Sequence, residues 1–160
     1  MTNTNQELVL KLKRNELFDP IVLSPHSEIN SDIYSAVENF TTRTKNISNL
    51  KITIFSPTIG KAIQEKFKEL FFEHYKDEED RIEIKIKAVS IKTIVLVLLA
   101  LIILFVWFKL SNTVLRELFG TLWAFNVWEA SHTFIEAIEA IHKKRRIISI
   151  KNAIIEFIDI

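Results

Sequence analysis

The 160-residue chain contains no cysteine, only two glycines and only three prolines. The absence of cysteine excludes disulfide bonds, thiolate catalysis and cysteine-based zinc sites. No nucleophile motif or glycine-rich phosphate loop is visible, so an enzyme is the least favoured class and no cofactor is expected. The formal net charge is +1, so the overall charge does not favour nucleic acid, and no nucleic acid partner is expected.

The chain does contain a run of sixteen uncharged residues, Thr93–Phe108, between Lys92 and Lys109. The run is apolar on every face, unlike an amphipathic surface helix. Its length lies between those of a buried core helix and a spanning helix, but uncharged residues continue beyond both lysines, whose ammonium groups can reach the headgroups. We therefore predict a membrane-spanning helix over about residues 92–110. The alternative is a central helix of a soluble domain.

A second apolar segment, Leu118–Ile135, carries one formal charge, that of Glu129. It is long enough to span a bilayer, and we predict a second span over about residues 118–138. The connection between the two spans, roughly Lys109–Glu117, is short, so the spans should form an antiparallel hairpin. Because the two helices cover part of each other, the second can carry a polar face.

Basic residues predict the orientation of this hairpin. They gather before the first span and after the second, at Arg81, Lys85, Lys87, Lys92, His142, Lys143, Lys144, Arg145, Arg146 and Lys151. The positive-inside rule then places both termini in the cytoplasm. Met1–Asn15 shows no signal peptide, and the richness in Ile, Lys and Asn suggests an AT-rich bacterial genome. The predicted location is the bacterial inner (cytoplasmic) membrane.

Alternation and capping patterns predict a small domain before the hairpin. The expected elements are a strand at Glu7–Lys13, an irregular connection at Asp19-Pro20 and Ser24-Pro25, a helix at Asp32–Phe40 capped by Asn30 or Ser31, a strand at Leu50–Phe55, and a helix that Thr58 caps. The last helix carries an apolar stripe of Ile59, Ile63, Phe67, Leu70 and Phe71. These patterns do not decide whether residues 80–90 form a helix or a strand. Ile82, Ile84 and Ile86 alternate as in a strand, but no helix breaker intervenes, and a continuous helix is favoured slightly.

The C-terminal segment Ile154–Ile160 has the composition of a strand and emerges on the side of the N-terminal domain, so it could join that sheet. The predicted fold class is therefore α+β: a small cytosolic domain of few strands and helices on an α-helical transmembrane hairpin. The predicted domains are residues 1–90 (cytosolic α+β domain), 91–140 (hairpin) and 141–160 (basic segment and terminal strand packing on the N-terminal domain).

The order of these elements, with Glu73-His74-Tyr75 on the second helix and Trp128-Glu129 in the second span, resembles a group of uncharacterised small bacterial two-transmembrane-helix proteins. In that group a Trp-Glu signature ends the second spanning helix, followed by a basic stretch and a short terminal strand. The resemblance implies two spanning helices and a cytosolic domain, and it implies no activity.

A polar stripe on the second span is the main candidate site. Asn126, Glu129, His132 (or Thr133) and Glu136 recur at three- and four-residue steps and share a helix face. The stripe could line a polar path between oligomerised hairpins. Glu129-x-x-His132 also has the spacing of a di-iron ligand pair, but the first span offers no further carboxylate, so no metal is expected. In the third interpretation Glu129 lies at the cytoplasmic interface, where it pairs with basic residues near Lys143 or caps the hairpin.

Two further motifs have alternative interpretations. Lys143, Lys144, Arg145 and Arg146 could orient the hairpin and contact anionic headgroups, or could bind a nucleotide or phosphorylated partner. Glu73-His74 could serve acid–base chemistry, but a surface pair is favoured.

Three function classes follow from these features. The favoured one is a membrane-anchored interaction or sensor module that recruits or regulates a cytosolic protein partner. The alternative is a homo-oligomerising effector that forms a pore or perturbs the bilayer in bacterial stress or phage defence. An enzyme is the third, and the predicted partners are the bilayer, further copies of the chain and a cytosolic protein.

Overall fold

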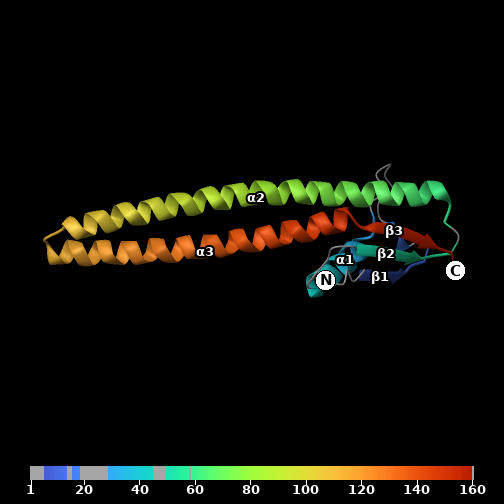
Figure 1. Ribbon diagram of the computed structural model, residues 1–160, viewed down its shortest axis with the longest axis horizontal. Coiled ribbons are helices and arrows are strands. Elements are labelled where there is room, and N and C mark those ends of the chain that lie inside the picture. Colours follow the sequence, from blue (N-terminus) through green and yellow to red (C-terminus); the bar gives the residue numbers. More distant parts are fainter. Residues whose placement is uncertain (1–5, 14–15, 19–28, 45–49, 58, 160) are drawn as a thin grey trace, which may run out of the picture. The chain divides into compact units, whose positions relative to one another are not determined.

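The computed structural model describes residues 6–13, 16–18, 29–44, 50–57 and 59–159. Figure 1 shows the secondary structure, whose elements in chain order are β1 (Gln6–Lys11), α1 (Ser31–Arg43), β2 (Leu50–Phe55), α2 (Lys61–Lys109), α3 (Thr113–Lys151) and β3 (Ile154–Ile158). The predicted Thr58 cap and the Asp-Pro and Ser-Pro connection lie outside the described residues. The described chain forms two compact units. We call Met1–Asp80 with Arg145–Ile160 the α/β unit, and Arg81–Lys144 the hairpin unit.

The α/β unit contains a three-stranded parallel sheet in the order β1-β2-β3 (Figure 1). Leu8 pairs with Ile52, and Ile52 in turn pairs with Ile155. The prediction that the C-terminal segment joins the N-terminal sheet is confirmed. The mixture of helices with a small sheet also agrees with the predicted class, although the chain is mostly helical. Parallel strands need crossover connections, and here helices supply them.

Alternation along the strands determines which side chains enter the core of the α/β unit. Ile52, Ile54 and Ile155 are buried, whereas Ile154 and Glu156 on the other face are exposed. Because side chains alternate between the two faces of a strand, one face of the sheet is apolar. From α2 the core receives Phe67, Phe71 and Tyr75, and the Phe67 ring meets the Phe157 ring edge-on at 5.6 Å.

Helix α1 begins as the capping pattern predicts. The Asn30 side chain accepts a hydrogen bond from the backbone nitrogen of Asp32 at 2.9 Å, which satisfies a donor at the open helix end. Two contacts hold the last turns of α3 in the same unit. Arg146 donates to Thr42 at 2.7 Å, and Lys151 pairs with Glu79 at 2.5 Å. The end of α3 and the strand that follows it are therefore integral to the α/β unit.

Residues 80–90 are helical within α2, so the favoured prediction is confirmed. The isoleucine alternation reflects two opposite faces of a helix rather than a pleated strand. The residues on one face follow alternating steps of four and three and are buried or half-buried: Ile82, Ile86, Val89, Thr93, Leu96 and Ala100. Ile84, on the opposite face, is 68% exposed. Steps of four and three give the 3.5-residue period of a helix that packs along its length against a partner helix.

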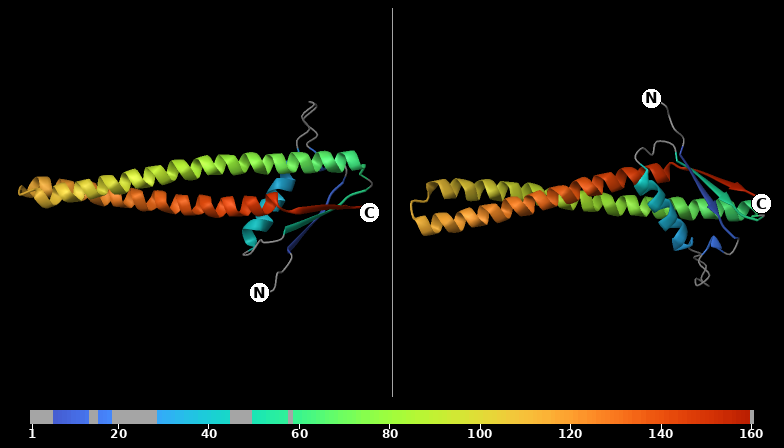
Figure 2. Two further views of the ribbon diagram at one scale, coloured as in Figure 1. Left: turned by 45° about the horizontal axis from the view of Figure 1, so that its top comes forward. Right: turned by 90° about the horizontal axis from the view of Figure 1, so that it is seen from below.

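The partner helix is α3, and the two run antiparallel within the hairpin unit (Figure 2). Contacts between them follow a reversed order: Glu83 with Lys144, Thr93 with Thr133, and Trp107 with Arg116. Near the turn, Gly120 lies beside the Trp107 ring, and a Cβ added there would be in ordinary contact with the indole nitrogen at 3.4 Å.

The hairpin differs from the predicted one in its boundaries. Only residues 110–112 separate α2 from α3, not Lys109–Glu117, because Asn112 caps α3 by accepting from the backbone nitrogens of Val114 at 3.0 Å and Leu115 at 3.2 Å. Helix α3 also continues past residue 138 to Lys151. Its inward-facing residues keep the four-and-three spacing from Asn126 through Ile147, and residues 126–151 contain no proline or glycine.

Candidate functional site

The candidate site is a layer of polar contacts between α2 and α3 in the hairpin unit. The face of α3 that packs on α2 consists of small or polar buried residues, namely Asn126, Ala130, Thr133, Ala137 and Ala140. Small side chains allow two helix backbones to approach closely. Polar groups on this face are therefore close enough to α2 to form hydrogen bonds directly.

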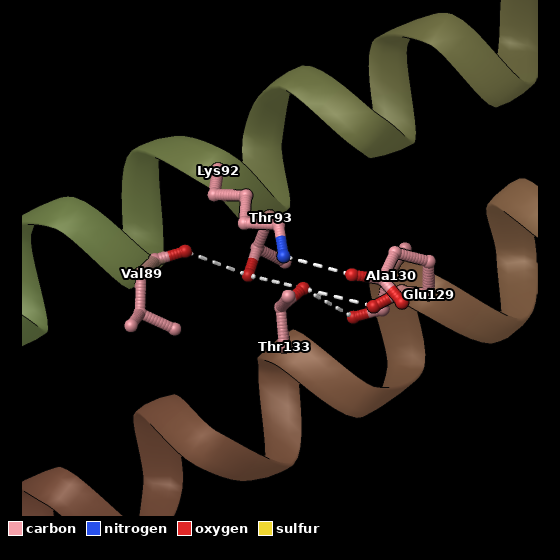
Figure 3. Close-up of polar contacts among 6 residues, drawn as sticks. All are labelled: Val89, Lys92, Thr93, Glu129, Ala130 and Thr133. Atoms are coloured by element: carbon pink, nitrogen blue, oxygen red, sulfur yellow. Dashed lines mark hydrogen bonds and ion pairs between the residues drawn. The ribbon is translucent and has the colours of Figure 1, made fainter.

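Two contacts link the helices at this layer (Figure 3). The Lys92 ammonium lies 2.7 Å from a carboxylate oxygen of Glu129, forming an ion pair. The Thr93 and Thr133 hydroxyls lie 3.0 Å apart, and Thr133 also has the carbonyl oxygens of Glu129 and Ala130 within 3.1 Å. The Thr93 hydroxyl lies 2.9 Å from the Val89 carbonyl. One hydroxyl can thus accept while the next donates, and both are satisfied inside the hairpin.

The structure divides the predicted polar stripe between two faces. Asn126 and Thr133 face α2, and the Asn126 amide donates to the Leu122 carbonyl of its own helix at 3.2 Å. His132 is exposed and stacks on the Trp128 ring at 5.9 Å. The choice that the sequence left open between His132 and Thr133 therefore falls on Thr133 for the inward face.

The two carboxylates of the stripe differ in their surroundings. Glu136 is half-buried. Glu129 pairs with Lys92, so the predicted partner near Lys143 is wrong. A helix rises about 1.5 Å per residue, which puts residue 143 about 21 Å further along α3 than Glu129.

Sequence reasoning missed Lys92 and Thr93 as members of the site. Lys92 was interpreted as a residue that reaches the headgroups, and Thr93 as the first residue of an apolar run. The available signal was the 3.5-residue spacing of Val89, Thr93 and Leu96, which places Thr93 on the packed face. No group of three or more metal-ligating side chains occurs among the residues that the structure describes, Glu129 and His132 included.

The basic run is partly occupied by contacts within the chain. Lys144 lies 3.2 Å from a Glu83 carboxylate oxygen, and Lys87 approaches the other oxygen at 3.3 Å. Hydrogen bonds from Lys144 and Lys87 hold the pKa of Glu83 below its usual range. Arg146 donates to Thr42 in the α/β unit. Part of the run therefore joins elements of the chain and is not wholly available to headgroups or phosphates.

One described helix, α2, contains a stretch long and apolar enough to cross a membrane, and only 11% of that stretch is buried by the rest of the protein. Helix α3 does not reach the same apolarity. Comparison of the chain with protein-family models, with curated proteins and with solved structures found no match.

Proposed function

We propose that this chain is a membrane-anchored interaction module. The hairpin unit spans the inner membrane of a bacterium, and the α/β unit lies in the cytoplasm, where it recruits or regulates a protein partner. The observation that carries the proposal is the pairing of β3 with β2 in one sheet with β1.

The connectivity of the chain implies that α3 also spans the membrane if α2 does. If α2 crosses a bilayer, the chain reaches the far side with only residues 110–112 before α3 begins. Strand β3 must nevertheless return to the sheet that contains β1 and β2. Helix α3 therefore has to cross in the opposite direction, although it is less apolar than α2. This requirement supports placing both ends of the described chain on the same side of the membrane.

The surface of the hairpin unit supports insertion into lipid. Large apolar side chains are exposed along both helices, including Ile94, Leu98 and Phe105 on α2 and Phe125 and Ile135 on α3. A monomer in water rarely exposes so extended an apolar surface. The core helix of a soluble domain would be mostly buried, whereas the most apolar stretch of α2 is not.

The length of the apolar stretch explains the position of the ion pair. Sixteen uncharged residues rise about 24 Å, and a hydrocarbon layer of about 30 Å requires roughly four more. Ala88–Ile91 supplies them, so Lys92 lies just inside the apolar layer. A charge there is costly unless it is paired, and Glu129 is the matching carboxylate.

The same contacts favour an anchor over a pore. A pore made from several hairpins needs polar groups that point toward a shared lumen. Here Glu129, Thr133 and Asn126 are bonded within one chain. The hollow on one side of the hairpin, about 380 Å³, is lined almost wholly by apolar side chains such as Val97, Leu101 and Phe134. These features support a surface that faces lipid.

Reconstitution into dye-loaded liposomes tests the anchor against the pore. We expect the full chain to remain with the vesicles after an alkaline carbonate wash and to release no dye. The variant Glu129→Gln keeps the size of the side chain, and the matched variant Glu139→Gln changes an exposed carboxylate elsewhere on α3. Neither should alter permeability. Leakage from the wild-type protein that Glu129→Gln abolishes and Glu139→Gln preserves would establish the oligomeric effector instead.

A further inference from the structure

The α/β unit contains a second cavity that the anchor does not use. Its volume is about 420 Å³, and it lies between the start of α1 and the first third of α2. Tyr34 of α1 and Leu70, Glu73, His74 and Asp77 of α2 line it. The α2 residues recur at steps of three and four, so they project from one face of that helix. With Ile29 and Ser31, which also line it, the cavity combines two apolar side chains, a serine, two aromatic rings and two carboxylates.

The two carboxylates in this cavity repel each other. Glu73 and Asp77 are four residues apart on a helix, where like charges are destabilising. Both are exposed, and neither forms an ion pair within the part of the chain that the structure describes. Burial raises the pKa of the neighbouring Tyr75 well above its usual value, and Glu38, Tyr34 and Glu78 raise it further. Residues 19–28, which precede the cavity in sequence, contain no lysine or arginine.

The aromatic side of the cavity is held in place by packing. The Tyr34 and His74 rings stack with centroids 3.9 Å apart and planes inclined by 24°. Phe71 stacks on Tyr34 at 6.0 Å, and Tyr75 meets its edge at 5.8 Å. Because three rings fix Tyr34, little side-chain freedom is lost when a ligand binds beside it. A fixed aromatic face next to carboxylates attracts planar cations.

We propose that this cavity binds a guanidinium group, with Glu73 and Asp77 accepting its hydrogen bonds and the Tyr34–His74 stack contacting its flat face. Guanidinium suits the cavity better than ammonium, since it is planar, weakly hydrated and able to bond two carboxylate oxygens at once. Its source is an arginine side chain of a partner protein or a free guanidino compound. If the source is a partner's arginine, the inference rests on the proposed interaction module. The guanidinium site itself does not depend on that function.

The test uses the full chain in detergent micelles and nuclear magnetic resonance signals of the His74 and Tyr34 rings. The probes are a capped Gly-Arg-Gly peptide, the matching Gly-Lys-Gly peptide and free agmatine. We expect the arginine peptide to shift both ring signals to saturation, and the lysine peptide to bind several-fold more weakly. Glu73→Gln with Asp77→Asn should weaken arginine binding at least ten-fold, or about 1.4 kcal/mol. Glu65→Gln, on the same helix but away from the cavity, should leave affinity unchanged.

Each outcome either supports the guanidinium site or overturns it. Ring signals that do not move with the arginine peptide or agmatine, or that move equally in the double carboxylate variant, overturn the guanidinium site. Agmatine binding as tightly as the peptide supports the site and assigns it to a free compound. Tighter peptide binding supports it and assigns it to a partner protein. Because the readout lies wholly in the α/β unit, failure here leaves the membrane anchor intact, and failure of membrane insertion leaves this result unaffected.

Discussion

Replacing Ile155 with alanine is expected to lower the free energy of unfolding of the α/β unit by about 2–5 kcal/mol. Ile155 is 5% exposed and lies in β3, where it pairs with Ile52 in the middle of the sheet. The alanine removes apolar atoms from a packed site and leaves a cavity. Because small domains have only about 5–15 kcal/mol of stability, the change removes a large part of the total. Chemical denaturation of the purified chain, followed by far-ultraviolet circular dichroism, measures the change in the free energy of unfolding.

The adjacent residue supplies a matched control. Ile154 has the same side chain in the same strand but is 62% exposed. Ile154→Ala should change the stability by no more than about 0.5 kcal/mol, as is usual at the surface. Equal effects at the two positions would contradict the observed register of β3, because a strand shifted by one residue exchanges its faces.

Replacing the opposite charges of Lys92 and Glu129 with two like charges is expected to reduce the yield of correctly inserted hairpin on the order of ten-fold. Lys92→Glu places two carboxylates together at the edge of the proposed membrane-embedded layer, and Glu129→Lys places two ammonium groups there. The double variant with both changes restores an opposite pair at the observed 2.7 Å contact and should recover most of the yield. Membrane-fractionated protein from cells, quantified against total protein, gives the measurement.

Lys109 is the control for this experiment, since it borders the same apolar run at its other end. Its ammonium lies over the Phe105 ring at 5.8 Å and forms no ion pair within the described residues. Lys109→Glu should therefore lower the yield much less, and no second substitution should rescue it. If the Lys92 and Glu129 exchanges are each harmless, or if the double variant is worse than both single variants, the pair does not stabilise the hairpin.

Much of the α/β unit could be predicted because local patterns and tertiary packing agree there. Strand Leu50–Phe55 has its predicted bounds, Asn30 caps α1, and the C-terminal strand joins the sheet. The parallel arrangement could not be obtained from alternation, which sets the buried face of a strand but not its direction. The end of α3 at Lys151 was missed because composition changes near residue 140 while the packed face continues.

The polar layer was harder to predict, since it depends on which helix face meets which. Residue types marked Asn126, Glu129 and His132 as unusual in an apolar segment, but spacing of three and four alone does not separate two adjacent faces. The alanines at positions 130, 137 and 140 identify the packed face, and they place Thr133 on it with His132 outside. Which residues of α2 contact this layer depends on the register between the two helices, and short-range sequence patterns do not determine that register.

The central claim is that the hairpin crosses a membrane and returns. Since the chain has no cysteine, a single cysteine at exposed Ser111, between α2 and α3, provides a unique thiol, and one at exposed Glu65 reports on the α/β unit. In bacteria whose outer membrane has been made permeable, a membrane-impermeant maleimide should label Ser111→Cys while the inner membrane is intact. It should label Glu65→Cys only after that membrane is opened. Protection of both thiols until lysis, or labelling of Glu65→Cys alone, would contradict the account.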